Sequence, residues 1–376
     1  MWQAEVRVDL DAIRHNVRLL RSHTTAEVMA VVKADAYGHG LVPCARAAVD
    51  AGATWLGVAT LDEAIALRTA GIDAAILAWL WAPGLPLHHA VRAGVDLSVA
   101  SVAQIDEVAS ATADADRPAR VHVKVDTGLH RSGASPSLWP EVFEAAAKAA
   151  TAGHLEVVSV WSHFANADAA GHPANDRQLA LYQEALSIAE RYGIGSPLRH
   201  MANSPALLTR PDSHFDLVRP GLAIYGLSPI AGESFGLRPA MSVRARIPLT
   251  KRVPAGEGVS YGHTYRTPAE TTLALIPLGY GDGVPRAASN AGEVAINGRR
   301  HPVVGRVCMD QFVVDAGDAD VQPGDEVVLF GPGTHGEPTA DDWAAATGSI
   351  NYEIVTRIGG GRIARVYDGA EGEDGQ

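Results

Sequence analysis

Short apolar runs alternate with longer amphipathic stretches from residue 27 to about residue 219. Eight of these runs have the length and apolar content of buried β-strands. They are EVMAVVK (27–33), TWLGVA (54–59), AAILAW (74–79), VDLSVA (95–100), RVHVKVD (120–126), EVVSVWS (156–162), LRHMAN (198–203) and DLVRP (216–220). Eight strand-then-helix units over roughly 200 residues predict an α/β fold, a (β/α)8 barrel of the TIM type.

The stretches between these runs have helical periodicity. In residues 61–71, Leu61, Ile65 and Leu67 fall near one face, and Gly71 is suited to end a helix. Residues 175–193 show the same pattern of apolar positions. These stretches are the helices that a parallel barrel requires between consecutive strands.

The pattern changes after about residue 236, where β-rich runs separated by turn residues replace the alternation. These runs are TLALIPLGYG (272–281), EVAINGRRHPVVGRVCMDQFVVDAG (293–317) and GDEVVLFG (324–331). We therefore predict a barrel at residues 11–235, then a C-terminal all-β domain at 236–367 that includes residues 1–10. The acidic, glycine-rich tail 368–376 is expected to be disordered.

Composition narrows the functional class. The net charge of −12 argues against nucleic-acid binding, and Cys44 and Cys308 form neither a CxxC pair nor a disulfide framework. The N-terminus has no signal-peptide core, and no apolar stretch has membrane-spanning length, so we expect a cytoplasmic protein without membrane contact. No HExxH, P-loop or GxGxxG motif occurs, and no metal is expected.

Lys33 is the first candidate for chemistry, because it ends an apolar strand in a chain with only four lysines. A barrel enzyme carries its active site at the C-terminal ends of its strands. An amine desolvated there has a lowered pKa and can act as a nucleophile toward a carbonyl substrate or pyridoxal phosphate (PLP). Taken alone, Lys33 could also be an ordinary strand-end lysine that extends to solvent.

Other polar residues follow the predicted strands. These are Tyr37, Lys124, Arg131, His163, Asn203, Ser204, Arg219 and Gly221. The segment ANSPALL (202–208) predicts a short helix capped by Asn203 or Ser204. Helix starts after the seventh and eighth strands are the usual phosphate site of barrel enzymes, which favours a phosphorylated ligand.

The chain resembles the alanine racemase family over nearly its whole length. The motifs that carry the resemblance are AVVKADAYGHG (30–40), KVDTGLHRSG (124–133), SHFANAD (162–168), HMANSPA (200–206), RPGLAIYG (219–226), VSYGHTYR (259–266), GYGDGVPR (279–286), VGRVCMDQ (304–311) and INYEIVTRIGGGRIARVY (350–367). The three adjacent glycines 359–361 and the pair Trp79 and Trp81 depart from the family pattern.

The resemblance implies a PLP-dependent enzyme that interconverts L- and D-alanine with two bases. Lys33 would bind PLP covalently and act as one acid/base, and Tyr261, from the partner subunit of a homodimer with shared active sites, as the other. The cofactor would also be held by Tyr37, His163, Asn203, Ser204, Arg219, Gly221, Leu222 and Tyr352. Arg131 and the Met309 amide would bind the substrate carboxylate, and Asp310 would support Tyr261. Lys124 would be carbamylated and position Arg131.

Arg219 discriminates between related activities. A guanidinium keeps its proton in proteins, so it would donate to the pyridine nitrogen and leave the ring a weak electron sink. A fold-related decarboxylase predicts a carboxylate at this position, and a non-catalytic PLP carrier would lack Tyr261. A racemase for serine or basic amino acids would share every motif and remains the alternative. The implied cellular role is supply of D-alanine for peptidoglycan.

Overall fold

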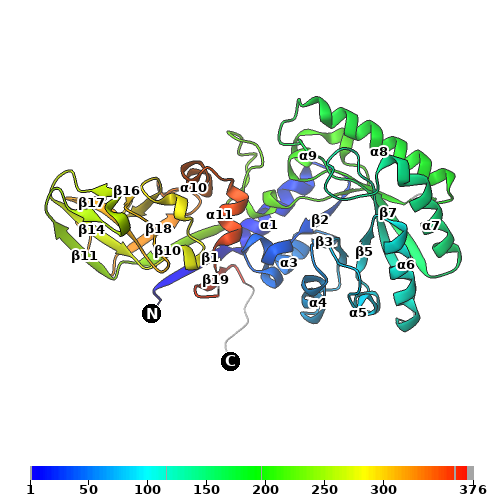
Figure 1. Cartoon of the computed structure of the whole chain (residues 1–376), viewed down its shortest axis with the longest axis horizontal. Helices are drawn as coiled ribbons and strands as arrows, with labels where there is room; N and C mark the ends of the chain where they lie inside the picture. Colours follow the sequence, from blue (N-terminus) through cyan, green and yellow to red (C-terminus); the bar gives the residue numbers. More distant parts are fainter. Residues whose placement is uncertain (1, 116, 196, 360, 371–376) are drawn as a thin grey trace. The chain divides into compact units, whose positions relative to one another are not determined.

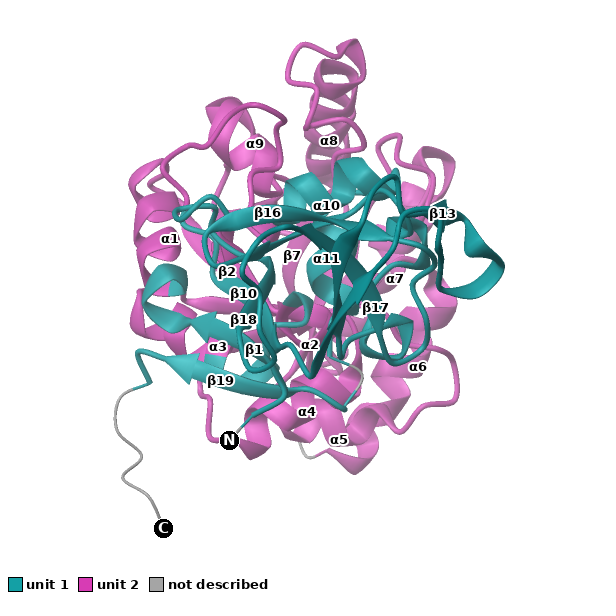
Figure 2. Ribbon diagram, turned by 90° about the vertical axis from the view of Figure 1, so that its left-hand side faces the viewer, with its two compact units in different colours: residues 1–13, 37–43, 238–376 teal, residues 14–36, 44–237 magenta. Residues whose placement is uncertain are grey.

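The computed structural model describes residues 2–115, 117–195, 197–359 and 361–370, which form two compact units (Figures 1 and 2). The barrel unit comprises Arg14–Ala36 and Cys44–Leu237. The β unit comprises Met1–Ile13, Tyr37–Pro43 and Arg238–Gln376. The tail predicted to be disordered was 368–376, but Asp368 is the last residue of strand β19 (Ala364–Asp368), where it pairs with Asp9. Positions 371–376 lie outside the described residues.

The barrel unit contains the eight parallel strands that the apolar runs predicted. They are β2 (Glu27–Val31), β3 (Trp55–Val58), β4 (Ala75–Ala78), β5 (Asp96–Val99), β6 (Ala119–Lys124), β7 (Leu155–Trp161), β8 (Leu198–His200) and β9 (Leu217–Val218). Their order is β8-β7-β6-β5-β4-β3-β2-β9. Backbone bonds from Asp216 N to Arg199 O (3.1 Å) and from Arg219 N to Ala202 O (2.9 Å) connect the two end strands. The prediction of a (β/α)8 barrel is confirmed.

Helices lie outside these strands, as Figure 1 shows for α4 to α8. The helices are α1 (Leu10–Ser22), α3 (Leu41–Asp50), α4 (Leu61–Thr69), α5 (Leu87–Arg92), α6 (Val102–Ala111), α7 (Trp139–Thr151), α8 (Pro173–Arg191) and α9 (Ser204–Thr209). Helix α4 begins with a capping box between Thr60 and Glu63 and is followed by Gly71 at φ +77°. The predicted helices at 61–71 and 175–193 are therefore present.

Apolar side chains fill the barrel interior. Met29, Trp55, Leu77, Val158 and Leu217 form one buried cluster contributed by five strands. The interior is packed so closely at Gly57 that a Cβ there would lie 2.7 Å from the Trp79 ring. This packing gives the polar residues at the strand ends a rigid support.

The β unit is built on a nine-stranded sheet, in the order β11-β14-β17-β16-β15-β18-β10-β1-β19, and a two-stranded ribbon, β12-β13. Its strands are β1 (Ala4–Asp9), β10 (Met241–Arg246), β11 (Leu249–Val253), β12 (Gly258–Val259), β13 (Tyr265–Arg266), β14 (Thr271–Ile276), β15 (Glu293–Ile296), β16 (Arg299–Val304), β17 (Phe312–Gly317), β18 (Glu326–Phe330) and β19 (Ala364–Asp368). Two short helices, α10 (Ala340–Thr347) and α11 (Asn351–Arg357), accompany the sheet. The prediction of a separate β-sheet domain is confirmed.

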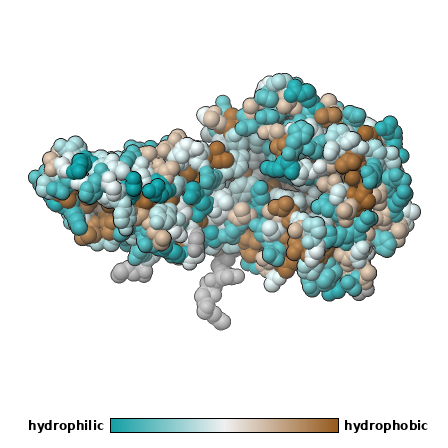
Figure 3. Space-filling model, viewed as in Figure 1, coloured by the Kyte–Doolittle hydropathy of each residue, from teal (hydrophilic) through white to brown (hydrophobic). Residues whose placement is uncertain are grey.

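The helices were compared with the length and hydropathy of a membrane-spanning segment. No described helix is both long enough and apolar enough to cross a bilayer. On the face seen in Figure 3, apolar side chains occur as separate patches among polar ones.

Candidate active site

The predicted site residues fall into two groups, one in each unit. The barrel group is Lys33, Lys124, Arg131, His163, Asn203, Ser204, Arg219, Gly221 and Leu222. The β-unit group is Tyr37, Tyr261, Met309, Asp310 and Tyr352. The two groups differ in burial and in hydrogen bonding.

Lys33 begins the turn α2 (Lys33–Tyr37), which has left-handed geometry. Ala34, Asp35, Ala36 and Tyr37 all have φ between +53° and +55°. Residues with a Cβ adopt this conformation at a cost of about 1–2 kcal/mol each. Strain of this kind persists only where surrounding contacts impose it, and it concentrates at functional sites.

One contact that holds this turn comes from the next strand–helix unit. Glu63 accepts a hydrogen bond from Ala34 N at 2.6 Å, and its other oxygen accepts from Ala59 N and Thr60 N at 2.9 and 3.1 Å. One carboxylate therefore ties the residue after Lys33 to the start of α4.

Lys33 itself is in an environment that favours the neutral amine. Burial, and secondarily the positive charge of Arg131, lowers the pKa of Lys33, while Glu63 acts in the opposite direction. Its Nζ lies 5.9 Å from the centre of the Trp79 ring. A lysine with these properties is a better nucleophile and base at neutral pH than an exposed one.

Lys124, at the end of β6, is buried beside the ring of Trp161. Its Nζ donates to Ser132 Oγ at 2.6 Å and lies 4.3 Å from the Trp161 ring centre. Burial, followed by the charges of Arg219 and Arg131, lowers the pKa of Lys124 to about 7. A substantial fraction of this amine is therefore unprotonated at neutral pH.

Arg131 is exposed on the loop that follows β6. Asp126 organises that loop, because its Oδ1 accepts from the amides of Gly128, Leu129 and His130 at 2.9 to 3.2 Å. Gly133, at φ +109°, closes it, and a Cβ at this position would lie 2.7 Å from Asp126 N. The loop thus holds an arginine near the two lysines of the barrel group.

Arg219 is almost fully buried just after β9. Its Nη2 donates to Ser162 O (2.8 Å) and Met201 O (3.2 Å) and to Nδ1 of His163 (3.1 Å). Its Nη1 donates to Nδ1 of His200 at 2.8 Å. Among the described residues, Nε has no hydrogen-bond partner. Burial lowers the pKa of Arg219 to about 9, which leaves the guanidinium charged at neutral pH.

The two histidines beside Arg219 are neutral. Burial, and then the charge of Arg219, lowers the pKa of both His163 and His200 well below their ordinary value of 6.5. Arginine can only donate, so Nδ1 of each ring is the acceptor, and each carries its proton on Nε2. His163 was predicted as a site residue. His200 was not, although it is the last residue of strand β8, at the end of the barrel where site residues were expected.

The segments predicted to bind phosphate are adjacent. Asn203 caps α9, accepting from Ala206 N at 3.3 Å. Ser204 Oγ accepts from Gly221 N at 2.9 Å and from Ala223 N at 3.3 Å. Leu222 is buried at the start of the 3₁₀ turn η4 (Leu222–Tyr225). Hydroxyl and amide groups from two loops therefore meet at the C-terminal end of β8 and β9.

Tyr261, in the β unit, lies on an exposed turn. The residue is 72% exposed, at the start of η5 (Tyr261–His263) between β12 and β13. The turn is anchored by its neighbours: Ser260, at φ +59°, donates from Oγ to Arg306 O at 2.7 Å. The backbone of Tyr261 is thus held in position while its phenol faces outward.

Met309 and Asp310 lie on a second exposed turn of the β unit. The Met309 carbonyl accepts from Gly281 N at 2.8 Å, and Asp310 pairs with Arg362 at 2.8 Å. A Cβ on Gly279 would lie 2.3 Å from Cys308 O, so only glycine fits against this turn. No described residue accepts a hydrogen bond from the Met309 amide.

Tyr37 and Tyr352 are neighbours within the β unit, with ring centres 6.2 Å apart. Burial raises the pKa of Tyr37, so its hydroxyl remains protonated and can donate. Their proximity is consistent with the shared role that the family resemblance implies for them.

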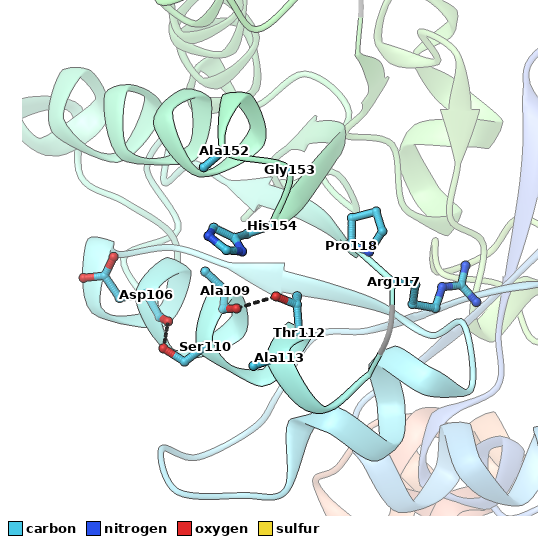
Figure 4. A pocket seen from close by; sticks show the side chains of 10 residues that line it. All are labelled: Asp106, Ala109, Ser110, Thr112, Ala113, Arg117, Pro118, Ala152, Gly153 and His154. Carbon is cyan, nitrogen blue, oxygen red and sulfur yellow. Dashed lines mark hydrogen bonds between the residues drawn. The ribbon is translucent and has the colours of Figure 1, made fainter.

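The barrel unit has a surface groove of about 800 Å3 (Figure 4). It is lined by Asp106 of α6 and by Arg117 and His154, which lie just before the starts of β6 and β7, among other residues. None of the predicted site residues lines it. Among the described residues, no group of three or more His, Cys, Asp or Glu side chains could hold a metal ion.

Known proteins resemble this chain along its whole length. A family model for the alanine racemase N-terminal domain matches residues 8–229, and one for the C-terminal domain matches residues 240–367. An alanine racemase of Salinispora arenicola is 67% identical, covering 98% of this chain and 99% of its own length. These relatives give no support to a racemase of broader specificity.

Solved structures agree. Alanine racemase from Streptomyces lavendulae matches with a TM-score of 0.97 and 52% identity, over 99% of this chain and 98% of its own. The enzyme from Bartonella henselae, solved with covalently bound pyridoxal phosphate, matches with a TM-score of 0.87 and 31% identity, over 97% of this chain and 99% of its own. On its sequence, its fold and both family models, the chain belongs to the alanine racemase family.

Proposed function

We propose that this protein racemises alanine with PLP as cofactor, using Lys33 and Tyr261 as its two acid/base groups. The observation that carries this proposal is Arg219, a buried guanidinium whose Nη atoms are occupied and whose Nε has no partner among the described residues. Such a group suits an aromatic ring nitrogen that must receive a hydrogen bond without receiving the proton.

The other polar groups fit PLP by their chemistry. Lys33 supplies an amine with a lowered pKa for the aldehyde, and the hydroxyl of Ser204, with the amides around Gly221 and Leu222, suits a phosphate. Tyr37 and Tyr352 would add two hydroxyls. Asn203 caps the helix that begins at Ser204, and His163 bonds to Arg219. When bound, PLP would supply the electron withdrawal that makes the α-proton of alanine removable.

Inversion needs one group on each side of the α-carbon, because a single base returns the proton to the face it left. We assign one face to the Lys33 amine, whose lowered pKa leaves more of it unprotonated at neutral pH and so available to accept a proton. The other face belongs to the phenol of Tyr261, which takes up or delivers a proton at its hydroxyl oxygen. Arg219 remains charged throughout and stabilises its hydrogen-bonding partners without exchanging a proton.

Arg131 and the Met309 amide are proposed to bind the substrate carboxylate, and Asp310 to support the turn that carries Tyr261. We propose that Lys124 is carbamylated and pairs with Arg131. Carbamylation needs a neutral amine, and the Lys124 pKa of about 7 provides one. An intact mass of the native protein, compared with that of Lys124→Ala, tests the modification.

Tyr261 is exposed within its own chain, which supports a homodimer with shared active sites in which this tyrosine serves the partner subunit. A cytoplasmic location and the supply of D-alanine for peptidoglycan belong to the same proposal. Cross-linking or analytical ultracentrifugation measures the oligomeric state.

The decisive experiment begins with the purified protein. We expect an absorbance band of bound cofactor, attachment of the cofactor to Lys33 after borohydride reduction, and conversion of L-alanine followed by circular dichroism. A protein that retains no cofactor on Lys33 and leaves L-alanine unchanged would rule out the proposed function. A comparison of serine and basic amino acids with alanine as substrates measures specificity.

A further inference from the structure

Three buried residues that the resemblance does not assign form a chain of hydrogen bonds ending at Arg219. His200 accepts from Arg219 Nη1 through Nδ1 (2.8 Å), and its Nε2 lies 3.0 Å from Nδ1 of His122. Nε2 of His122 lies 3.0 Å from Oδ2 of Asp96. All four side chains are at most 4% exposed.

The chain passes along the barrel interior. Asp96 is the first residue of β5, His122 is in the middle of β6, and His200 is the last residue of β8. It therefore runs from the N-terminal end of the strands to the C-terminal end, where Arg219 lies. The rings of Trp55 and Trp161 pack against the two histidines, with Trp161 stacked on His200 at an interplanar angle of 14°.

The chemistry of the groups allows one arrangement of protons. Arginine has no acceptor, so Nδ1 of His200 accepts and the His200 proton is on Nε2. Nε2 of His200 must then donate to Nδ1 of His122, whose own proton is therefore on Nε2. That proton points at Asp96, which must be an ionised acceptor. The reverse order would require His200 to accept at both nitrogens, that is, to be an imidazolate.

We propose that Asp96, His122 and His200 are positioning residues that hold the Arg219 guanidinium in its donating orientation through this single order of protons. Arg120 fixes the far end, since its Nε donates to Oδ1 of Asp96 at 2.8 Å and its Nη1 contacts Glu156 at 2.7 Å. Two neutral rings connect the charge of Arg219 to a carboxylate without placing that carboxylate near the reacting atoms.

The charge states of Asp96 and His200 agree with this order. Burial alone raises the pKa of Asp96, but the hydrogen bonds from His122 and Arg120 hold it below its ordinary value. Burial and the charge of Arg219 keep His200 neutral. The consequence for catalysis, though not the proton order itself, rests on the function proposed above.

Nitrogen NMR of protein labelled with ¹⁵N-histidine tests the proton order directly. In the unsubstituted protein at neutral pH, we expect His122 and His200 to be neutral with the proton on Nε2, their signals being assigned by loss in His122→Gln and His200→Gln. A His200 ring protonated at Nδ1, or at both nitrogens, overturns the proposal. This measurement does not need turnover, and the proton order is observed in the unsubstituted protein, the two variants serving only for assignment.

Asp96→Asn then tests the coupling, because an amide presents a donor where the carboxylate presented two acceptors. We expect the His122 and His200 signals to change, and kcat to fall roughly tenfold with the KM for L-alanine unchanged. The matched control is Asp216→Asn, which removes a carboxylate bound to Arg199 elsewhere in the barrel. It should change neither the two histidine signals nor kcat.

Unchanged histidine signals in Asp96→Asn overturn the coupling. If the ordered tautomers are found in a protein that does not racemise alanine, the chain stands and the proposed function fails. If the protein racemises alanine but His122 and His200 do not have the ordered tautomers, the proposed function stands and the proposed chain of hydrogen bonds fails.

Discussion

The barrel unit and the β unit hold their proposed site residues in opposite ways. Arg219 and Lys124 are buried and His163 is half-buried. Arg219 bonds to His163 and to the barrel backbone, Lys124 bonds to the Ser132 hydroxyl, and burial lowers the pKa of all three. Tyr261 and Met309 lie on exposed turns, and the two residues are 72% and 53% exposed. The barrel therefore sets the charge state of its residues internally, whereas the β unit fixes backbone positions and presents side chains outward.

This difference has a consequence for mutation. Substitution of a buried barrel residue such as Arg219 should change both chemistry and stability, because its side chain has several buried partners. Substitutions on the exposed turns should change chemistry alone. The four predictions below test this contrast, in order of decreasing effect.

Lys33→Ala should have the largest effect. We expect racemisation to fall on the order of 10³-fold or more, since both the covalent attachment of the cofactor and one of the two bases are lost. Rates of L-alanine conversion measure this loss. Lys148→Ala is the control, because Lys148 is an exposed lysine of α7 paired with Glu144 and should be silent. Substantial activity in Lys33→Ala would contradict the role.

Tyr261→Phe should lower racemisation by roughly 10²- to 10⁴-fold, the usual range for a lost acid/base group. Because the phenol is exposed, the melting temperature should not change. Exchange of the α-hydrogen with solvent should persist for one enantiomer only, since one base remains. Tyr192→Phe, on an exposed tyrosine of the barrel unit, is the control. Equal exchange from both enantiomers would exclude a two-base mechanism.

Arg219→Glu should affect both activity and stability. A carboxyl group can protonate the ring nitrogen, so we expect at least roughly tenfold slower racemisation together with long-wavelength absorbance and pyruvate from transamination. Loss of the bonds to Ser162 and Met201 should lower the melting temperature as well. Arg219→Lys keeps the charge and separates the two effects. An unchanged spectrum with substrate would argue against the assigned role.

The smallest predicted effect is on stability at mildly acidic pH. His163 and His200 have folded-state pKa values well below 6.5, so the unfolded chain binds more protons than the folded one below that pH. The stability that these two neutral histidines allow should therefore be fully present above about pH 6.5. It should decline as the pH falls below that value, and Tm should fall by roughly a few degrees. Calorimetry of the parent and of His163→Asn measures this, and the variant should show a shallower decline. Identical slopes would place the pH sensitivity elsewhere.

Much of this molecule was determined by its sequence alone. Apolar runs of strand length, separated by amphipathic stretches, specify the eight barrel strands, because parallel strands covered by helices must be apolar on both faces. The later change to β-rich runs with turn residues marks the second fold in the same way. The motif residues could be assigned roles through resemblance because a specific chemistry requires those side chains at those positions.

Only the tertiary structure decided two features. The left-handed turn at residues 34–37 contains no glycine or asparagine that would predict it, and it depends on contacts from Glu63. The chain from Asp96 through His122 and His200 joins residues that are far apart in sequence but meet inside a closed barrel. Arg120, His122 and Lys124 alternate along β6, which indicates that the strand has one polar face. Which side chains of other strands contact that face is decided only when the barrel closes. Sequence periodicity specifies the elements, whereas proton positions and strain arise from long-range packing.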